Sequence, residues 1–184
     1  MKYFIGFLVT IGLIILLIVL LASGGGKPKV QTTQRSLISY ANSDAVVRMT
    51  IDGPINANQD HRQIQVTVNR DQVTFEQMNG YDGQVAAQQQ YASTQNAYTN
   101  FLAALTRANF TKGDSSKDMA DERGLCPLGD RFVFELIDNG TDVQRFWATS
   151  CGGTKTYQGN LNLTVQLFRL QVPDYDTLAG TAGI

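Results

Sequence analysis

The sequence has few of the side chains on which enzyme and metal sites are usually built. It contains one histidine, two cysteines and three glutamates among 184 residues. One histidine and two cysteines cannot complete a four-ligand zinc site at any recognised spacing. The glycine runs at 24–26 and 152–153 do not open helices after strands, as phosphate-binding loops do. We therefore expect no metal and no cofactor.

Basic residues are also scarce and are not clustered. The part of the chain after residue 29 holds all sixteen acidic residues and twelve of the fifteen Lys and Arg residues, which gives it a formal charge of −4. Nucleic acids and anionic lipids are bound through clustered Lys and Arg. The charge pattern therefore argues against nucleic acid as a partner.

One long apolar run, Phe4–Ala22, lies near the N-terminus. Its nineteen residues carry no charge, and as a helix they would cover about 28 Å, close to the ~30 Å hydrocarbon core of a bilayer. A signal peptide has a shorter apolar region of ~7–15 residues, so the run favours an uncleaved membrane anchor. Ala22-Ser23-Gly24 also resembles a cleavage site, which leaves cleavage open. No cysteine follows the run, which excludes a lipoprotein.

This anchor divides the chain into segments. We expect a cytoplasmic stub at 1–3, a transmembrane anchor in the lipid bilayer at 4–22, and a flexible linker at 23–36, where three glycines and a proline cannot pack a core. Residues 37–176 are predicted to form one extracytoplasmic domain. Residues 177–184 have little to bury and are predicted to be a disordered tail.

Residue periodicity predicts an α+β fold. Alternation of apolar and polar residues, or a hairpin signal at Asn139-Gly140, indicates strands; they are expected near 47–51, 64–68, 73–75, 131–137 and 142–149. Residues 84–91 are either a further strand, which we favour, or the beginning of a helix. Helical spacing predicts helices at 94–109 and 161–172 and a helical turn at 37–42. The expected fold is an N-terminal transmembrane helix, then an antiparallel sheet of about six strands with two helices packed on one face.

The Asn139-Gly140 turn also predicts how the last two strands pair. If Asp138 pairs with Thr141, the facing pairs are Phe132–Trp147, Phe134–Arg145 and Leu136–Val143. Val133, Ile137 and Phe146 then lie on the opposite face. They form either an exposed apolar patch for a partner, or a surface covered by the N-terminal turn or by the loop 114–124.

The same register brings Cys126 and Cys151 to within a couple of residues of each other, close enough for a disulfide bond. Closing that loop stabilises a fold by about 3 kcal/mol in the chain-entropy model. A disulfide requires an oxidising compartment. Together with the membrane anchor, the disulfide therefore predicts a single-pass protein of the cell membrane. Its N-terminus would be cytoplasmic and its C-terminal domain outside. Two buried free thiols are the alternative.

His61 is the one candidate for a catalytic side chain. A general base needs a nucleophile and an orienting carboxylate nearby, and the sequence supplies only the adjacent Asp60. We therefore expect a surface histidine in a loop. The glutamates Glu76, Glu122 and Glu135 have no spacing that distinguishes the carboxylate pair of a glycosidase from solvated positions. We assign no catalytic residue.

Short motifs from Asp52 onward carry a resemblance to a known group. They are His61-Arg62, Gly80-Tyr81, Ala97-Tyr98, Phe101-Leu102, Ala104-Leu105, Cys126-Pro127-Leu128-Gly129, Trp147, Ser150-Cys151-Gly152 and Gln171-Val172-Pro173-Asp174-Tyr175. Over residues 37–176 the chain resembles an uncharacterised family of single-span, exported small proteins of Saccharibacteria-type candidate-phylum bacteria. The resemblance implies a bacterial source and a cell-surface location. It implies no activity and no catalytic position.

The sequence favours a binding or scaffold module of the cell envelope over an enzyme, with another envelope protein as a further expected partner. Two alternatives stay open. One is a minor pilin-like surface subunit, since pilins also begin with an apolar helix before a β-rich head, although Ile11 stands where a prepilin cut at Gly6-Phe7 would require glutamate. The other is an envelope hydrolase.

Overall fold

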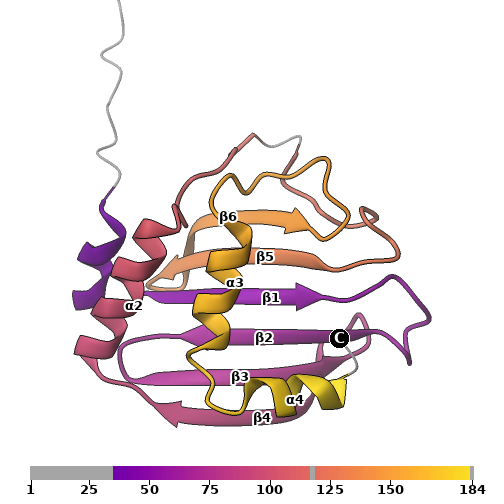
Figure 1. Ribbon diagram of the computed structural model, residues 1–184, viewed down its shortest axis with the longest axis horizontal. Helices are drawn as coiled ribbons and strands as arrows, with labels where there is room; N and C mark the ends of the chain where they lie inside the picture. Colours follow the sequence, from indigo (N-terminus) through magenta and orange to yellow (C-terminus); the bar gives the residue numbers. More distant parts are fainter. Residues whose placement is uncertain (1–34, 117–118, 183–184) are drawn as a thin grey trace, which may run out of the picture. The chain divides into compact units, whose positions relative to one another are not determined.

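The structure is a computed structural model of the chain, and it describes residues 35–116 and 119–182. Within these residues, six strands form one antiparallel sheet in the order β4-β3-β2-β1-β5-β6 (Figure 1). In chain order the strands are β1 (Val46–Asp52), β2 (Arg62–Val68), β3 (Gln72–Asn79), β4 (Gln84–Ala92), β5 (Arg131–Asp138) and β6 (Thr141–Thr149). Strand β1 joins the meander of β1 to β4 to the hairpin of β5 and β6, because it pairs with both β2 and β5.

Each alternating stretch of the sequence is a strand with one buried face. In β1, Val47, Met49 and Ile51 are buried and the residues between them are half-buried. Met49 lies opposite Val66 of β2 and Phe134 of β5, so the apolar face continues across the neighbouring strands. This is the pattern of a sheet that packs on one side only. The predicted strand at 84–91 is confirmed as β4, although it is exposed along nearly its whole length.

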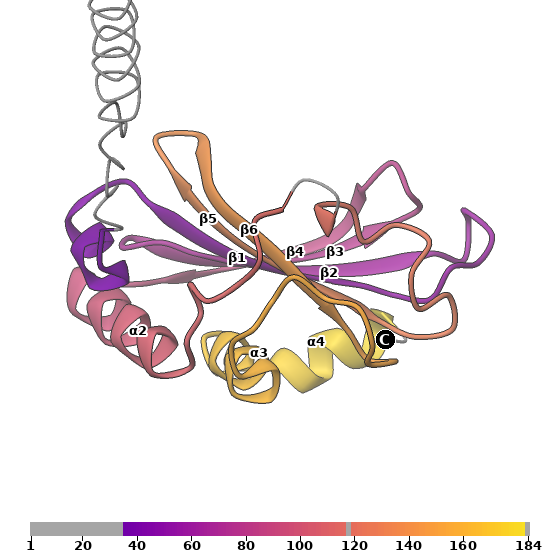
Figure 2. The ribbon, with the colours of Figure 1, turned by 90° about the horizontal axis from the view of Figure 1, so that it is seen from above.

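Helices cover one of the two faces of the sheet, which we call the helix face, and the other is the open face (Figure 2). They are the 3₁₀ helix η1 (Leu37–Asn42), α2 (Gln95–Arg107), α3 (Leu161–Arg169) and α4 (Tyr175–Ala182). The side chain of Thr94 accepts a hydrogen bond from the Ala97 N–H at the start of α2, and Asn160 caps α3 through the Leu163 N–H. Such caps fix where helices begin. Helices α2 and α3 thus lie where the spacing predicts them.

An aromatic cluster joins the helices to the sheet. The ring of Phe134 in β5 has its centroid 4.6 Å from that of Tyr157, 6.1 Å from Phe110 and 6.4 Å from Phe168 of α3. Phe168 in turn packs edge-on against Phe101 of α2 at 5.2 Å. Buried aromatic pairs of this kind contribute about 0.5–1.5 kcal/mol beyond the burial of their area. The cluster therefore fixes α2 and α3 on the same part of the sheet.

The predicted pairing of the second hairpin is wrong by one residue. Asp138 does pair with Thr141, but Val143 bulges out of β6 and has no partner in β5. One extra residue moves every later side chain of a strand to the other face. The three predicted pairs are therefore replaced by Phe132–Ala148, Phe134–Phe146 and Leu136–Gln144, with Val133 opposite Trp147.

This bulge also removes the predicted apolar patch of Val133, Ile137 and Phe146. Phe146 pairs with Phe134 in the core on the helix face. Val133 stays on the open face beside Trp147, but both side chains are buried there. The indole Nε1 of Trp147 donates to the carbonyl oxygen of Met119 at 2.7 Å. Met119, from the loop at 114–124, therefore covers this part of the open face, in agreement with one of the two alternatives.

The predicted fold class needs two corrections. The apolar run Phe4–Ala22 lies outside the described residues, and in the part of the chain that the structure describes no helix is long and apolar enough to cross a membrane. A transmembrane helix is therefore not part of the observed fold. The number of helices packed on the sheet is also wrong, since α4 joins α2 and α3 on the helix face (Figure 2).

Helix α4 replaces most of the tail that was predicted to be disordered at 177–184. Tyr175 and Ala179, one helical turn apart, are buried against the sheet, and the Tyr175 ring packs edge-on against Phe75 at 5.7 Å. Alanines and a glycine bury little area, so the sequence pattern is weak. The helix forms because β2 and β3 present an apolar surface to it.

We predict that Tyr175→Ala lowers the free energy of unfolding by about 3 kcal/mol or more, because it opens a cavity against Phe75. Urea unfolding followed by circular dichroism measures the change. Leu170→Ala is the matched control, since that side chain is 77% exposed and its loss should change the stability by about 0.5 kcal/mol or less. Equal effects of the two substitutions would show that α4 does not contribute to the core.

Candidate functional site

His61, the candidate from the sequence, is completely buried, which corrects the expectation of a surface histidine. Its Nε2 lies 2.8 Å from Oδ1 of Asp52, and its Nδ1 lies 3.2 Å from the carbonyl oxygen of Pro54. The ring of Tyr81 stacks on the imidazole with centroids 3.9 Å apart. The carboxylate partner is thus Asp52, from the preceding strand, and not the neighbouring Asp60. With both nitrogens bonded and no exposed surface, His61 is not placed to act as a general base.

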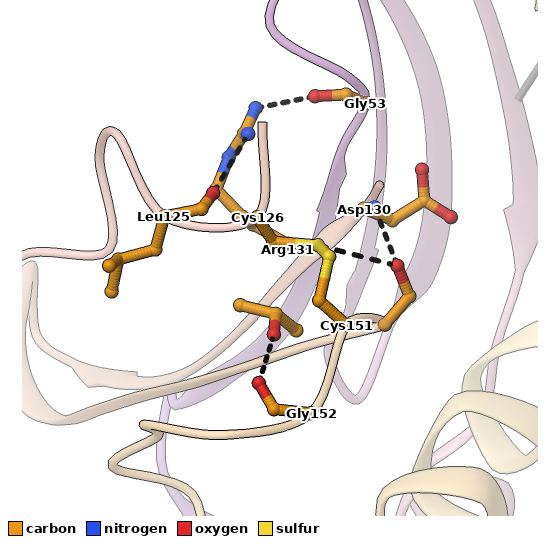
Figure 3. The surroundings of a disulfide bond; sticks show 9 residues. Gly53, Leu125, Cys126, Asp130, Arg131, Cys151 and Gly152 are labelled. Carbon is orange, nitrogen blue, oxygen red and sulfur yellow. Dashed lines mark hydrogen bonds between the residues drawn. A yellow bond between two sulfur atoms is a disulfide. The ribbon is translucent and has the colours of Figure 1, made fainter. Parts of the chain in front are cut away.

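Asp52 also holds a second buried basic side chain. It pairs with Arg131 across β1 and β5, and its Oδ2 lies 2.8 Å from both Nε and Nη2 of that arginine. Arg131 is 1% exposed and also donates to the carbonyl oxygens of Gly53 and Leu125 (Figure 3). Charge-assisted hydrogen bonds of this kind are the strongest in proteins. The cluster of Asp52, His61 and Arg131 therefore ties β1 and β5 to the loop that precedes β2.

The predicted disulfide between Cys126 and Cys151 is present, with Cα atoms 5.7 Å apart (Figure 3). It joins the loop before β5 to the turn after β6. Beside it, the backbone N–H of Asp130 donates to Oγ of Ser150 at 2.9 Å. Gly129 lies so close to Ser150 and to Sγ of Cys126 that a Cβ there would clash. The disulfide and the Asp52 cluster together close one end of the sheet, which is a structural role.

Two of the three glutamates meet at an arginine on the open face. Glu122 accepts two hydrogen bonds from Arg145, at 2.6 and 2.8 Å, and Glu135 lies 3.7 Å from the same guanidinium. The hydrogen bonds to Glu122 raise the pKa of Arg145. Glu122 itself is buried although its loop is highly charged. Glu122 therefore holds residues 119–124 against β6 through Arg145, and Glu135 of β5 lies beside the same guanidinium. Glu76 lies elsewhere, on β3, where its carboxylate accepts a hydrogen bond from Gln88. In residues 35–116 and 119–182, no cluster of three or more His, Cys, Asp or Glu is arranged to bind a metal ion.

The best candidate binding site is a hollow beside α3, which we call the α3 hollow. It has a volume of about 610 Å³ and lies where α3 leaves the ends of β5 and β6 uncovered. Its apolar lining comes from Phe132, Ala148, Leu161 and Val165. Its volume lies within the range of about 300–1,000 Å³ that is typical of small-ligand sites, and its other eight lining residues are polar or glycine.

Two cations, Lys155 and Arg169, are among the residues that line the α3 hollow. Six other arginines of the described residues lie within 4 Å of a carboxylate, but Lys155 and Arg169 have no such ion pair there. The Arg169 guanidinium instead lies over the ring of Tyr175, 5.0 Å from its centroid. The α3 hollow therefore has two positive charges in its lining that no carboxylate of the described residues within 4 Å neutralises.

Three aspartates lie near Arg169 and reduce the positive potential there. Arg169 also borders a second hollow of about 820 Å³, which runs along α4 and is lined in part by Asp174 and Asp176. Partial burial raises the pKa of Asp130, and the charges of Arg131 and Arg169 offset only part of that shift. These carboxylates therefore offset part of the positive charge of Arg169.

No pattern in the sequence predicts the α3 hollow. Phe132 and Ala148 lie on β5 and β6, Lys155 in a turn, and Arg169 on a helix. Only the packing of α3 across the sheet brings them together. The helical spacing at 161–172 predicts which face of α3 is buried, but not which strands it leaves uncovered.

We predict that Asp52→Asn lowers the free energy of unfolding by about 3–5 kcal/mol, because it leaves Arg131 and His61 buried without their carboxylate. The measurement is urea unfolding at neutral pH. Asp82→Asn, at an exposed turn residue, is the control and should change stability by about 0.5 kcal/mol or less. A loss no larger than that of the control would mean that the cluster does not stabilise the fold.

Asp130 gives a prediction of pH dependence. Its pKa is higher in the folded chain than the ordinary value of 3.8, so the native state loses stability as the pH rises from 3.8 through the raised pKa. Asp130→Asn does not titrate and should be more stable than the wild type at pH 7. The difference should disappear below pH 3.8, where both states of the wild type are protonated. Thermal unfolding between pH 3.5 and 7 tests this, and a wild type that is the more stable at pH 7 would contradict it.

Comparison with protein-family models and with curated proteins finds no match to this chain.

Proposed function

We propose that the domain is a binding module of the cell envelope, exposed outside the cytoplasm, and that it holds an anionic ligand with an apolar part in the α3 hollow. The observation that carries the proposal is that two cations without an ion pair among the described residues, Lys155 and Arg169, line the same hollow as the apolar residues Phe132, Leu161 and Val165. A carboxylate or phosphate lies between the cations, while the apolar part displaces water from Phe132 and Val165. Hydrogen bonds from charged donors and apolar burial then act together.

The location outside the cytoplasm rests on the disulfide. Cys126 and Cys151 are bonded, and disulfides persist in oxidising compartments. Localisation at the cell membrane with a cytoplasmic N-terminus stays a prediction, since it depends on residues before 35. Cell fractionation followed by protease treatment of intact cells tests it.

The described residues favour binding over hydrolysis. A hydrolase of the kind considered from the sequence would use His61 as its base, and that ring is buried with both nitrogens bonded. The hollow, by contrast, is open to solvent and has both apolar and cationic side chains in its lining. The pilin-like alternative rests on the N-terminal segment and gains no support from the described residues.

The test uses hexanoate as the anionic probe and hexanol as its neutral analogue of equal chain length. For a ligand of this size we expect a Kd of about 1 mM, with NMR shift changes confined to residues that line the α3 hollow. Hexanol should bind at least about tenfold more weakly, because it makes no charge-assisted hydrogen bond.

Charge-removing variants identify the cations responsible. Lys155→Gln combined with Arg169→Gln should weaken hexanoate binding about tenfold or more and leave hexanol binding unchanged. Arg107→Gln is the matched control, since Arg107 is another exposed arginine without an ion pair but lies at the end of α2. Equal binding of the two probes, or an equal loss in the Arg107 variant, would overturn the proposal.

A further inference from the structure

The two edges of the sheet differ sharply in how they are protected. At one edge, the backbone of Trp147 in β6 is bonded to Thr156 and Tyr157, at 2.8–3.0 Å, and Val143 bulges out of the strand. At the other edge, β4 pairs only with β3 among the described residues, and no chain lies beyond it in Figure 1. An unpaired edge presents free N–H and C=O groups that can pair with another strand.

Strand β4 also lacks the residues that normally keep an edge from pairing. Its nine residues, Gln84–Ala92, include no charge and no proline, and eight of them are exposed, with only Tyr91 half-buried. Natural edge strands usually carry Lys, Pro or an inward charge to prevent association. The bulge beside Met78 leaves Ala87–Ala92 as a regular stretch of six residues.

We propose that β4 pairs antiparallel with β4 of a second copy of this chain, which forms a twelve-stranded sheet across a two-fold axis at Gln89. A neutral strand can approach its own copy without repulsion between like charges, which a charged strand cannot. Because β6 is blocked, a second copy has only one edge to pair with. The assembly therefore closes at two copies and does not grow into a fibre.

The regular part of β4 is complementary to itself in this register. A two-fold axis at Gln89 places that residue opposite its own copy, and an amide side chain can donate and accept at once. On the same face, Ala87 lies opposite Tyr91 of the second copy, so a small side chain meets a large one. On the open face, Gln88 lies opposite Gln90. Cross-strand pairs of this kind set the register of a sheet.

The inference is independent of the proposed ligand. The α3 hollow is lined by residues of β5, β6, α3 and the turn after β6, and none of its lining residues comes from β4. Dimer formation and hexanoate binding can therefore succeed or fail separately.

Cysteine cross-linking of the full-length chain tests the pairing directly. Gln89→Cys places two thiols at the axis, where facing Cβ atoms are about 4.5–5.5 Å apart, so mild oxidation should produce a covalent dimer on a non-reducing gel. Gln158→Cys is the matched control, at an exposed glutamine beyond the other edge of the sheet, and should stay monomeric. Equal cross-linking of the two variants, or none at Gln89, would overturn the proposal.

Charge substitution at the same position tests it without a covalent bond. In sedimentation equilibrium, Gln89→Lys and Gln89→Glu should each weaken self-association at least about tenfold, because like charges meet at the axis, and an equal mixture of the two should restore it. Gln158→Lys should have no effect. The proposal fails if the wild type shows no self-association, if both Gln89 variants associate as the wild type does, or if the mixture does not recover.

Discussion

Strand β1 is hydrogen-bonded on both sides, and its pairing with β5 is the contact on which the rest of the structure depends. It joins residues 46–52 to residues 131–138, which lie about eighty positions later in the chain. Without it, β5 and β6 would be an isolated two-stranded hairpin, which has little independent stability in water. The Asp52–Arg131 ion pair lies at the end of this same pairing, and the disulfide closes the loops beside it.

The sheet is asymmetric in its faces and in its edges, and this asymmetry defines the surfaces available for function. Helices cover one face, and the α3 hollow lies beside α3 near the ends of β5 and β6, where Phe132 and Ala148 contribute to its lining. On the open face, the loop held by Glu122 and Arg145 covers the aromatic residue Trp147. At the β6 edge, the backbone of Trp147 is hydrogen-bonded to Thr156 and Tyr157. At the other edge, β4 pairs only with β3 among the described residues.

Several features could be predicted because they depend on near neighbours in the chain. Alternation gave β1 to β3, the Asn139-Gly140 turn gave the second hairpin, and helical spacing gave α2 and α3. The disulfide could be predicted because its register is counted from that turn, and a bulge of one residue shifts the cysteines too little to prevent the bond. The same bulge was enough to reverse the faces of Phe146 and Trp147, since side chains alternate with a period of two.

The sequence by itself determined the element types, the single apolar face of each buried strand and the pairing of the two cysteines, because these follow from local periodicity and turn chemistry. Only the tertiary structure decided the burial of His61 against Asp52, the helix at Tyr175–Ala182 and the meeting of Lys155 with Arg169 at one hollow. Each of these requires segments far apart in the chain to meet. Their free energy comes from burial and charge pairing between those segments, which no short stretch of sequence contains.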